Sequence, residues 1–149
     1  MSKSIWNQRY VEMARTVSTW SKDPSTQVGA VAVDENRRIL SVGYNGFPRG
    51  INDDAKRYAD KEEKYRLVVH AEMNCIYNAT YNGVSLHGST MYVWGLPVCS
   101  DCAKGIIQTG VKMVYWSIEK EIPARWQESY QNTKAIFEEA GVVFKRIKI

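Results

Sequence analysis

The hydrophobic and polar positions along the chain follow two spacings, one typical of helices and one typical of strands. Residues 4–20 place apolar side chains, Val11 and Trp20 among them, at helical spacing, whereas 28–34 and 38–44 are short runs rich in β-branched residues. The polar turn between these two runs predicts a β-hairpin. We therefore expect the chain to start with a helix and two antiparallel strands.

The rest of the chain alternates helical and strand patterns in a regular order. We expect helices at 69–82, 99–109 and 123–140, each followed by a glycine, and strands at 89–94, 111–118 and 142–149. Strands separated by helices favour parallel pairing, so the order α-β-β-α-β-α-β-α-β predicts a three-layer α/β/α fold with a mixed five-stranded sheet flanked by helices. The polar segment 45–66 is long for a plain connection, and such segments are typically functional or partly helical.

Length and composition are those of one globular domain, which we expect to span residues 1–149. The N-terminus turns polar too soon for a signal peptide, and the apolar runs fall short of the roughly 18 residues of a membrane span. The net charge of +4 suits a small anionic ligand, but the basic residues are too scattered for a nucleic-acid partner. Three cysteines, two of them in a C-x-x-C, indicate metal binding in a reducing compartment, so we expect a cytoplasmic protein without a membrane partner.

His70, Glu72, Cys99 and Cys102 form the pattern that carries the most chemistry. One imidazole and two thiolates supply three ligands for a tetrahedral Zn²⁺, and a fourth position left open for water is typical of a catalytic site. Both motifs begin predicted helices, whose N-termini lower thiol pKa values. The order H-x-E and then P-C-x-x-C is the signature of zinc nucleobase deaminases.

This pattern predicts hydrolytic deamination of a cytosine ring. Zinc lowers the pKa of a water toward neutral, and the resulting nucleophile attacks C4 of the ring. Glu72 takes the proton of that water, protonates the ring nitrogen and helps ammonia to leave.

Other interpretations of the same residues are open at this point. A C-x-x-C alone would also suit a redox pair or half of a structural zinc site. On a helix, Cys75 turns away from His70, so we expect a buried structural thiol, and His87, in a polar turn, is expected at the surface. A polynucleotide base deaminase would carry the same motif together with a basic groove and exposed aromatic side chains, and a non-catalytic nucleotide sensor could share the fold.

Five sequence blocks extend the pattern beyond the zinc motif. They are SKDPSTQVGA at 21–30, GYNGFPRG at 43–50, HAEMN at 70–74, GSTMYV at 88–93 and CAKGIIQTG at 102–110. Over roughly residues 5–146, their order resembles the deoxycytidylate (dCMP) deaminase branch of the cytidine deaminase superfamily, and the first two blocks are the more specific. The resemblance implies a cytidine-deaminase-like fold and zinc-dependent hydrolysis of dCMP to dUMP and ammonia.

The resemblance also implies roles for single residues. It assigns zinc binding to His70, Cys99 and Cys102 and proton transfer to Glu72. It assigns substrate binding to three positions: Asn45 at the sugar, the backbone of Ala71 at the base, and Thr26.

Regulation by nucleotides follows from the same resemblance. It implies activation by dCTP and inhibition by dTTP, with Mg²⁺ on the phosphates of the bound triphosphate. The regulatory nucleotide would contact Asn45, Gly46, Arg49, Gly50 and Asn52, because a glycine-rich loop beside an arginine suits phosphate. Members of this branch often form hexamers, so we expect a homo-oligomer.

The chain departs from the family pattern in three places. Val98 separates Pro97 from Cys99, one residue more than usual, which alters the loop expected at the base. The tyrosine that often follows the fourth strand is absent from 118–121, and three residues could replace it as the stacking surface: Trp94, Trp116 and Trp126. The regulatory loop lacks the extra cysteine and histidine of some phage members, so no second zinc is expected.

Overall fold

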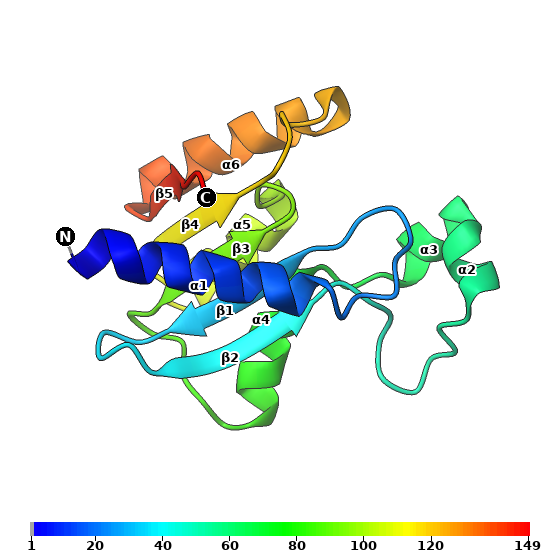
Figure 1. The fold of residues 1–149 in the computed structure, drawn as a ribbon, viewed down its shortest axis with the longest axis horizontal. Coiled ribbons are helices and arrows are strands. Elements are labelled where there is room, and N and C mark those ends of the chain that lie inside the picture. The colour runs from blue at the N-terminus through cyan, green and yellow to red at the C-terminus, as the bar shows by residue number, and fades with distance from the viewer. Residues whose placement is uncertain (1) are drawn as a thin grey trace.

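The computed structural model describes residues 2–149, in which a five-stranded sheet lies between helices on both faces (Figure 1). The elements are α1 (Ser2–Ser18), β1 (Gly29–Val33), β2 (Ile39–Tyr44), α2 (Ala55–Ala59), α3 (Lys61–Leu67), α4 (Ala71–Tyr81), β3 (Thr90–Trp94), α5 (Ser100–Gln108), β4 (Met113–Ser117), the 3-10 turn η1 (Ala124–Trp126), α6 (Gln127–Ala140) and β5 (Val143–Arg146). The strand order is β2-β1-β3-β4-β5. Strand β1 is antiparallel to β2 and β3, whereas β3, β4 and β5 are parallel. The expected three-layer fold with a mixed sheet is confirmed.

Alternate side chains of the central strands face the two helical layers, as the two-residue repeat of a strand requires. Val31 and Tyr92 pack in the cluster beneath α1, whereas Ala30 and Met91 pack in the cluster formed with α4, α5 and α6. Gly43 on β2 allows α4 to approach closely, since a Cβ at this position would lie 2.3 Å from a backbone nitrogen of that helix. The start of α4 is therefore fixed against the sheet.

Several boundaries differ from the sequence-based expectation. Helix α4 begins at Ala71 rather than at 69, β4 begins at Met113 rather than at 111, and α6 begins at Gln127 rather than at 123 because the 3-10 turn η1 precedes it. Helix α1 ends before Trp20, whose side chain is 54% exposed, because the chain turns there toward β1. Strand β5 ends at Arg146 rather than at 149. Within residues 2–149, no helix combines the length and the apolar character needed to cross a membrane.

The polar segment 45–66 proves to be partly helical, and α2 and α3 form an arm, residues 55–67, that projects from the body of the molecule (Figure 1). Asp54 and Asp60 cap these helices, each accepting a hydrogen bond from a backbone N–H three residues further on. The two helices contact each other more than they contact any other helix or strand. The position of the arm therefore depends on a small number of attachments.

Candidate active site

Helices α4 and α5 lie in contact, and each begins directly after a potential metal ligand. His70 is the N-cap of α4 and Cys99 is the N-cap of α5, both with an extended backbone. The sulfur of Cys99 accepts a hydrogen bond from the backbone N–H of Cys102 at 3.4 Å, as N-cap side chains do for the first turn of a helix. The two sequence motifs meet because each occupies the first turn of a neighbouring helix.

Three ligand atoms converge between these helix starts. The imidazole Nδ1 of His70 lies 3.3 Å from Sγ of Cys99 and 3.3 Å from Sγ of Cys102, and all three atoms lie within 4.8 Å of one another. Zn–N and Zn–S bonds of about 2.0–2.1 and 2.3 Å in a tetrahedron place nitrogen and sulfur roughly 3.6 Å apart, so the group fits Zn²⁺ after small adjustments. Within residues 2–149, this is the only group with such a geometry.

The protonation of this cluster already favours a thiolate. Hydrogen bonding with Cys102 and His70 outweighs burial and lowers the pKa of Cys99 to about 4, whereas the hydrogen bond with Cys99, together with burial, raises the pKa of Cys102. The hydrogen bond to Cys99 raises the pKa of His70 to about 9. Zinc takes a neutral imidazole and two thiolates, so its binding would release protons from this cluster.

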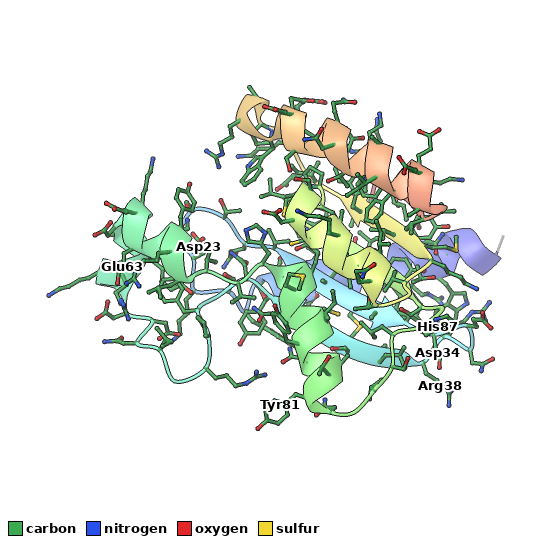
Figure 2. The ribbon with its side chains drawn as sticks, turned by 180° about the vertical axis from the view of Figure 1, so that it is seen from behind. Asp23, Asp34, Arg38, Glu63, Tyr81 and His87 are labelled. Atoms are coloured by element: carbon green, nitrogen blue, oxygen red, sulfur yellow. The ribbon has the colours of Figure 1, made fainter. Side chains whose placement is uncertain are left out.

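Cys75 and His87 lie where the sequence places them. Cys75 is fully buried outside the His-Cys-Cys group, and burial raises the pKa of its thiol to about 12. His87 is exposed at the opposite end of the molecule from Asp23 (Figure 2). The predictions of a buried thiol and a surface histidine are confirmed.

Glu72 lies in the first turn of α4, and only 4% of its surface is exposed. Burial raises the pKa of its carboxyl to about 7. A carboxyl that titrates near neutral pH can both accept and return a proton, as general acid–base chemistry requires.

A cavity of about 590 Å³ opens onto this cluster. Its lining comes from the 23–28 loop, the arm, the first turns of α4 and α5, and η1. A volume of this size lies within the range of about 300–1,000 Å³ that is typical of small-ligand sites. The cavity therefore places a small organic ligand against Glu72 and the potential metal ligands.

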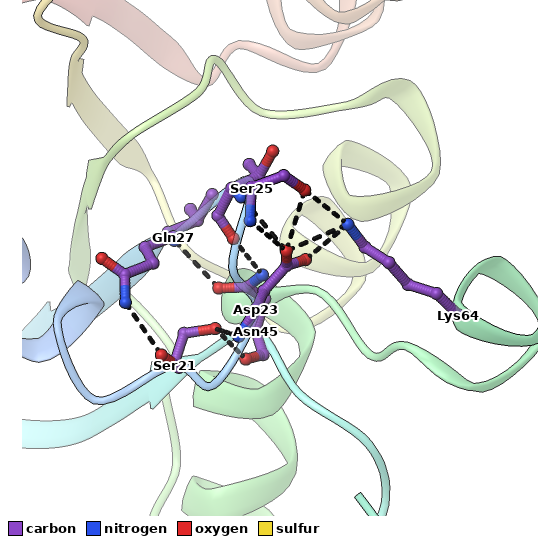
Figure 3. A network of polar contacts seen from close by, with 8 residues as sticks. Ser21, Asp23, Ser25, Gln27, Asn45 and Lys64 are labelled. Carbon is purple, nitrogen blue, oxygen red and sulfur yellow. Dashed lines mark hydrogen bonds and ion pairs between the residues drawn. The ribbon is translucent and has the colours of Figure 1, made fainter. Parts of the chain in front are cut away.

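The three positions expected to bind substrate all line the cavity: Asn45, Ala71 and Thr26. The carboxamide of Asn45 accepts a hydrogen bond from the N–H of Val28 at 2.9 Å and donates one to the carbonyl of Thr26 at 2.9 Å (Figure 3). One of its N–H groups makes no hydrogen bond within the described chain. Asn45 therefore fixes the 26–28 wall of the cavity and keeps one donor for a ligand.

Four of the five expected regulatory positions lie outside the cavity: Gly46, Arg49, Gly50 and Asn52. The guanidinium of Arg49 donates to the side chain of Asn78 and lies over the ring of Tyr81, 5.3 Å from its centroid. Asn45 is the single member of this set that lines the cavity, so the structure separates the other four from the zinc group.

The structure distinguishes the three candidate tryptophans. Trp126 lines the cavity. Trp116 is buried against Phe144 in the core, and Trp94 packs in the cluster of α1 beneath the guanidinium of Arg15. Only Trp126, among the three, can offer its ring to a ligand in the cavity.

The sequence reasoning missed several charged and aromatic residues of the lining: Asp23, Tyr58, Lys61, Lys64, Tyr65 and Arg125. Lys64 is paired with Asp23. Lys61 and Arg125 are exposed and make no ion pair within residues 2–149. No local pattern marks them, because they come from a polar segment and a short irregular turn.

The α/β/α fold, the His-Cys-Cys group and the buried glutamate beside it define a zinc-type nucleobase deaminase site. Residues 4–118 match the family model of the cytidine and deoxycytidylate deaminase zinc-binding region. The chain belongs to the cytidine and deoxycytidylate deaminase family and is a hydrolytic deaminase.

Similarity extends over most of the chain. It is 44% identical over 140 residues to the protein named "Uncharacterized deaminase in luxG 3′region" of Aliivibrio fischeri, which covers 93% of this chain and 91% of that one. It is 38% identical over 148 residues to the deoxycytidylate deaminase of Homo sapiens, covering 95% and 79% of the two chains. The crystal structure of the dCMP deaminase from the cyanophage S-TIM5 in complex with dCMP and dUMP superposes with a TM-score of 0.76 at 27% identity, covering 94% and 95%.

Proposed function

We propose that this protein deaminates dCMP to dUMP and ammonia, using one zinc ion held by His70, Cys99 and Cys102. The observation that carries the proposal is the meeting of these ligands with the buried carboxyl of Glu72 at a nucleotide-sized cavity. The names of two relatives, the human deoxycytidylate deaminase and the cyanophage dCMP deaminase, support dCMP as the substrate.

Bound zinc supplies Lewis-acid activation of a water. The carboxylate of Glu72 accepts a proton as the water oxygen bonds to C4 of the cytosine, and it delivers that proton to N3. A second proton from the same oxygen passes through Glu72 to the amino nitrogen. The C4–N bond then breaks, ammonia leaves, and the carbonyl of uracil remains. The pKa of about 7 suits a group that must carry protons in both directions.

Other lining residues fit the remaining parts of the nucleotide. We assign the sugar to the side chain of Asn45, with Thr26 beside it, and the base to the backbone of Ala71 and the ring of Trp126. The 5′-phosphate requires cations, and an exposed guanidinium or ammonium without an ion pair suits it best. Three cations line the cavity, of which Lys64 is already paired, so the charge available to a phosphate comes from Lys61 and Arg125.

We further propose that dCTP activates and dTTP inhibits the enzyme, with Mg²⁺ on the triphosphate. The support is the loop that follows Asn45, in which the exposed residues Arg49 and Gly50 offer a guanidinium and a backbone N–H to phosphates. The backbone N–H of Gly46 is already bonded to the carbonyl of Val69. The binding positions would be Asn45, Gly46, Arg49, Gly50 and Asn52. Because Asn45 belongs to both sites, the loop provides a short connection between regulator and substrate.

A homo-oligomer, specifically a hexamer, is also proposed. Exposed aromatic side chains on α4 support it, since Tyr77 and Tyr81 present apolar surface to the outside, and Tyr81 lies at the outer end of that helix (Figure 2). Light scattering of the zinc-loaded protein tests the assembly. The unpaired cysteines Cys75, Cys99 and Cys102 support a cytoplasmic location.

The proposed function is tested by turnover of cytidine, deoxycytidine, CMP, dCMP and a cytosine-containing oligonucleotide, each with and without dCTP and dTTP. We expect the highest kcat/KM for dCMP, and dCTP and dTTP should move its half-saturating concentration in opposite directions. Turnover confined to the oligonucleotide would contradict the proposal and favour a polynucleotide deaminase.

A further inference from the structure

A buried ion pair joins the arm to the loop that precedes β1. The ammonium of Lys64 on α3 donates to both carboxylate oxygens of Asp23, at 3.0 and 2.8 Å, and to the hydroxyl of Ser25 at 3.0 Å (Figure 3). The side chains of Lys64 and Asp23 are 11% and 2% exposed. An ammonium has three donors, and each of the three has a partner here.

The same carboxylate organises the loop on its own side. Asp23 accepts hydrogen bonds from the backbone N–H groups of Ser25 and Thr26 at 2.9 and 3.1 Å and from the hydroxyl of Ser25 at 3.0 Å. Burial opposes the charge of this carboxyl, but the hydrogen bonds from Lys64, Ser25 and Thr26 outweigh it and lower the pKa. One side chain thus shapes the loop that presents Thr26 to the cavity and also binds the arm.

The arm has few other attachments to the body. Phe47 stacks on Tyr58 at 4.2 Å between ring centroids, and Lys22 forms an ion pair with Asp53, just before the arm, at 3.1 Å. The Lys22–Asp53 pair joins nearly the same two segments as the Asp23–Lys64 pair, but its side chains are 65% and 44% exposed. Exposed pairs of this kind contribute little, so the buried pair is the main polar attachment made by side chains. Two residues beyond the arm, Val69 and Gly46 exchange two backbone hydrogen bonds, at 2.8 and 3.1 Å.

The two segments that this pair joins are walls of one cavity. Thr26 and Val28 line it from the loop, and Tyr58, Lys61 and Tyr65 line it from the arm. We propose that Lys64 is a positioning residue for nucleotide binding, because its ion pair with Asp23 sets the separation between the arm and the 23–28 loop. This inference rests on the proposed function, and it assigns to Lys64 a role that neither zinc binding nor proton transfer includes.

The kinetic consequence is specific. Lys64 is not one of the zinc-binding group, and its ammonium is fully used by Asp23 and Ser25. Loosening the wall should therefore weaken ground-state and transition-state binding alike, which raises KM and leaves kcat unchanged. Loss of fold stability alone would not raise KM at unchanged kcat in the fraction of protein that remains folded.

The first test compares Lys64→Met with Lys22→Met, two lysines that each attach the loop to the segment of the arm. We expect Lys64→Met to raise the KM for dCMP by about tenfold or more with kcat within about threefold, as loss of uniform binding predicts. Zinc content should equal that of the wild type. Lys22→Met should leave KM within about twofold, as for an exposed ion pair. Equal KM values for wild type and Lys64→Met would overturn the proposal.

The second test separates position from stability. Lys64→Met leaves the carboxylate of Asp23 buried without its partner, which destabilises the fold, whereas the double variant Asp23→Asn with Lys64→Met removes both charges and keeps an oxygen for the N–H groups of Ser25 and Thr26. The midpoint of thermal unfolding should recover in the double variant, but KM should stay high because the ion pair between the arm and the 23–28 loop is still missing. Recovery of KM together with stability would overturn the positioning role.

Hydrogen exchange gives a measurement that does not depend on turnover. Amides of residues 55–67 should exchange faster in the double variant than in the wild type, with β3 unchanged. Unchanged exchange in the arm would overturn the inference even if KM rose. If the wild type failed to deaminate dCMP, the proposed function would fall, and the effect of the same variants on the dissociation constant of dUMP would still decide whether Lys64 positions the nucleotide site.

Discussion

The Nδ1 atom of His70 lies 3.3 Å from Sγ of Cys102, although 32 positions separate the two residues in sequence. They meet because α4 and α5 pack closely, with the small side chains of Ala71 and Ala103 fully buried in the shared core. A metal ion at this point would bind two helices at once. Zinc should therefore stabilise the folded protein as well as supply the chemistry, since a ligand that binds only the folded state raises stability.

Cysteine substitutions test the metal group. Cys99→Ser should lower the zinc content sharply, because it removes one of three ligands. Cys75→Ser should leave the zinc content unchanged, because that thiol lies outside the group. Metal analysis of the two purified variants compares their zinc contents, and both variants carry the same cysteine-to-serine change. An equal loss of zinc in both would contradict the assignment.

Arg125 is expected to bind the phosphate of the substrate. Arg125→Gln should raise the KM for dCMP by about tenfold or more, because hydrogen bonds to charged groups contribute roughly 1.5–3 kcal/mol. Turnover of deoxycytidine, which has no phosphate, should change little. Lys120→Gln is the control, since Lys120 is an exposed cation before η1 that does not line the cavity. Equal losses on dCMP and deoxycytidine would argue against a phosphate contact.

Arg49 is expected to mediate regulation. Arg49→Ala should reduce the effects of both dCTP and dTTP on half-saturation by dCMP, while kcat at saturating dCMP stays near the wild-type value. Allosteric coupling is typically about 1–3 kcal/mol, which is large enough to measure as a shift of the rate curve. Arg38→Ala serves as the control, because Arg38 is exposed at the far end of the hairpin (Figure 2). Wild-type rate curves that superimpose with and without both nucleotides would remove the regulatory site.

Asp23 should make stability depend on acid pH. Its pKa is lower in the folded protein than the ordinary value of 3.8, so the unfolded chain takes up the proton first as pH falls. The contribution of Asp23 to the free energy of unfolding is therefore complete above about pH 5. It is lost as pH falls through about 4 toward the pKa that Asp23 has in the folded protein. The midpoint of thermal unfolding of the wild type, measured after a chelator has removed zinc, should fall between about pH 5 and pH 3 relative to that of the neutral double variant Asp23→Asn with Lys64→Met. A difference that stays constant over this range would contradict the prediction.

The zinc motif was predictable from sequence because its geometry is local. His70 and Cys99 each precede a helix, and the strands and helices around them show regular spacing. Their contact then follows from the packing of two neighbouring helices. The order of elements and the parallel pairing of β3, β4 and β5 were predictable for the same reason.

The arm was not predictable in the same way. Its mixed charges, as in the run from Lys61 to Lys64, are typical of a solvated surface, and Tyr58 and Lys64 are its buried residues. The burial of Lys64 is decided by Asp23, 41 positions away, which no local pattern records. Likewise, the sequence does not show which tryptophan faces the ligand, because Trp94, Trp116 and Trp126 each lie in or near the end of an expected strand or helix. Only tertiary packing distinguishes Trp126 from the other two.

The most direct test of the central claim is the rate of dUMP and ammonia formation from dCMP by wild type and by Glu72→Ala at equal zinc content. General acid–base groups contribute about 10²–10⁴-fold, and Glu72 serves more than one proton transfer, so we predict a loss at the upper end of this range or beyond it. The zinc content and the midpoint of unfolding should show that the variant is folded and loaded. Equimolar dUMP and ammonia from the wild type, with almost none from the variant, is the predicted result. Retention of more than about a tenth of the wild-type rate, far above what that range allows, would contradict the account.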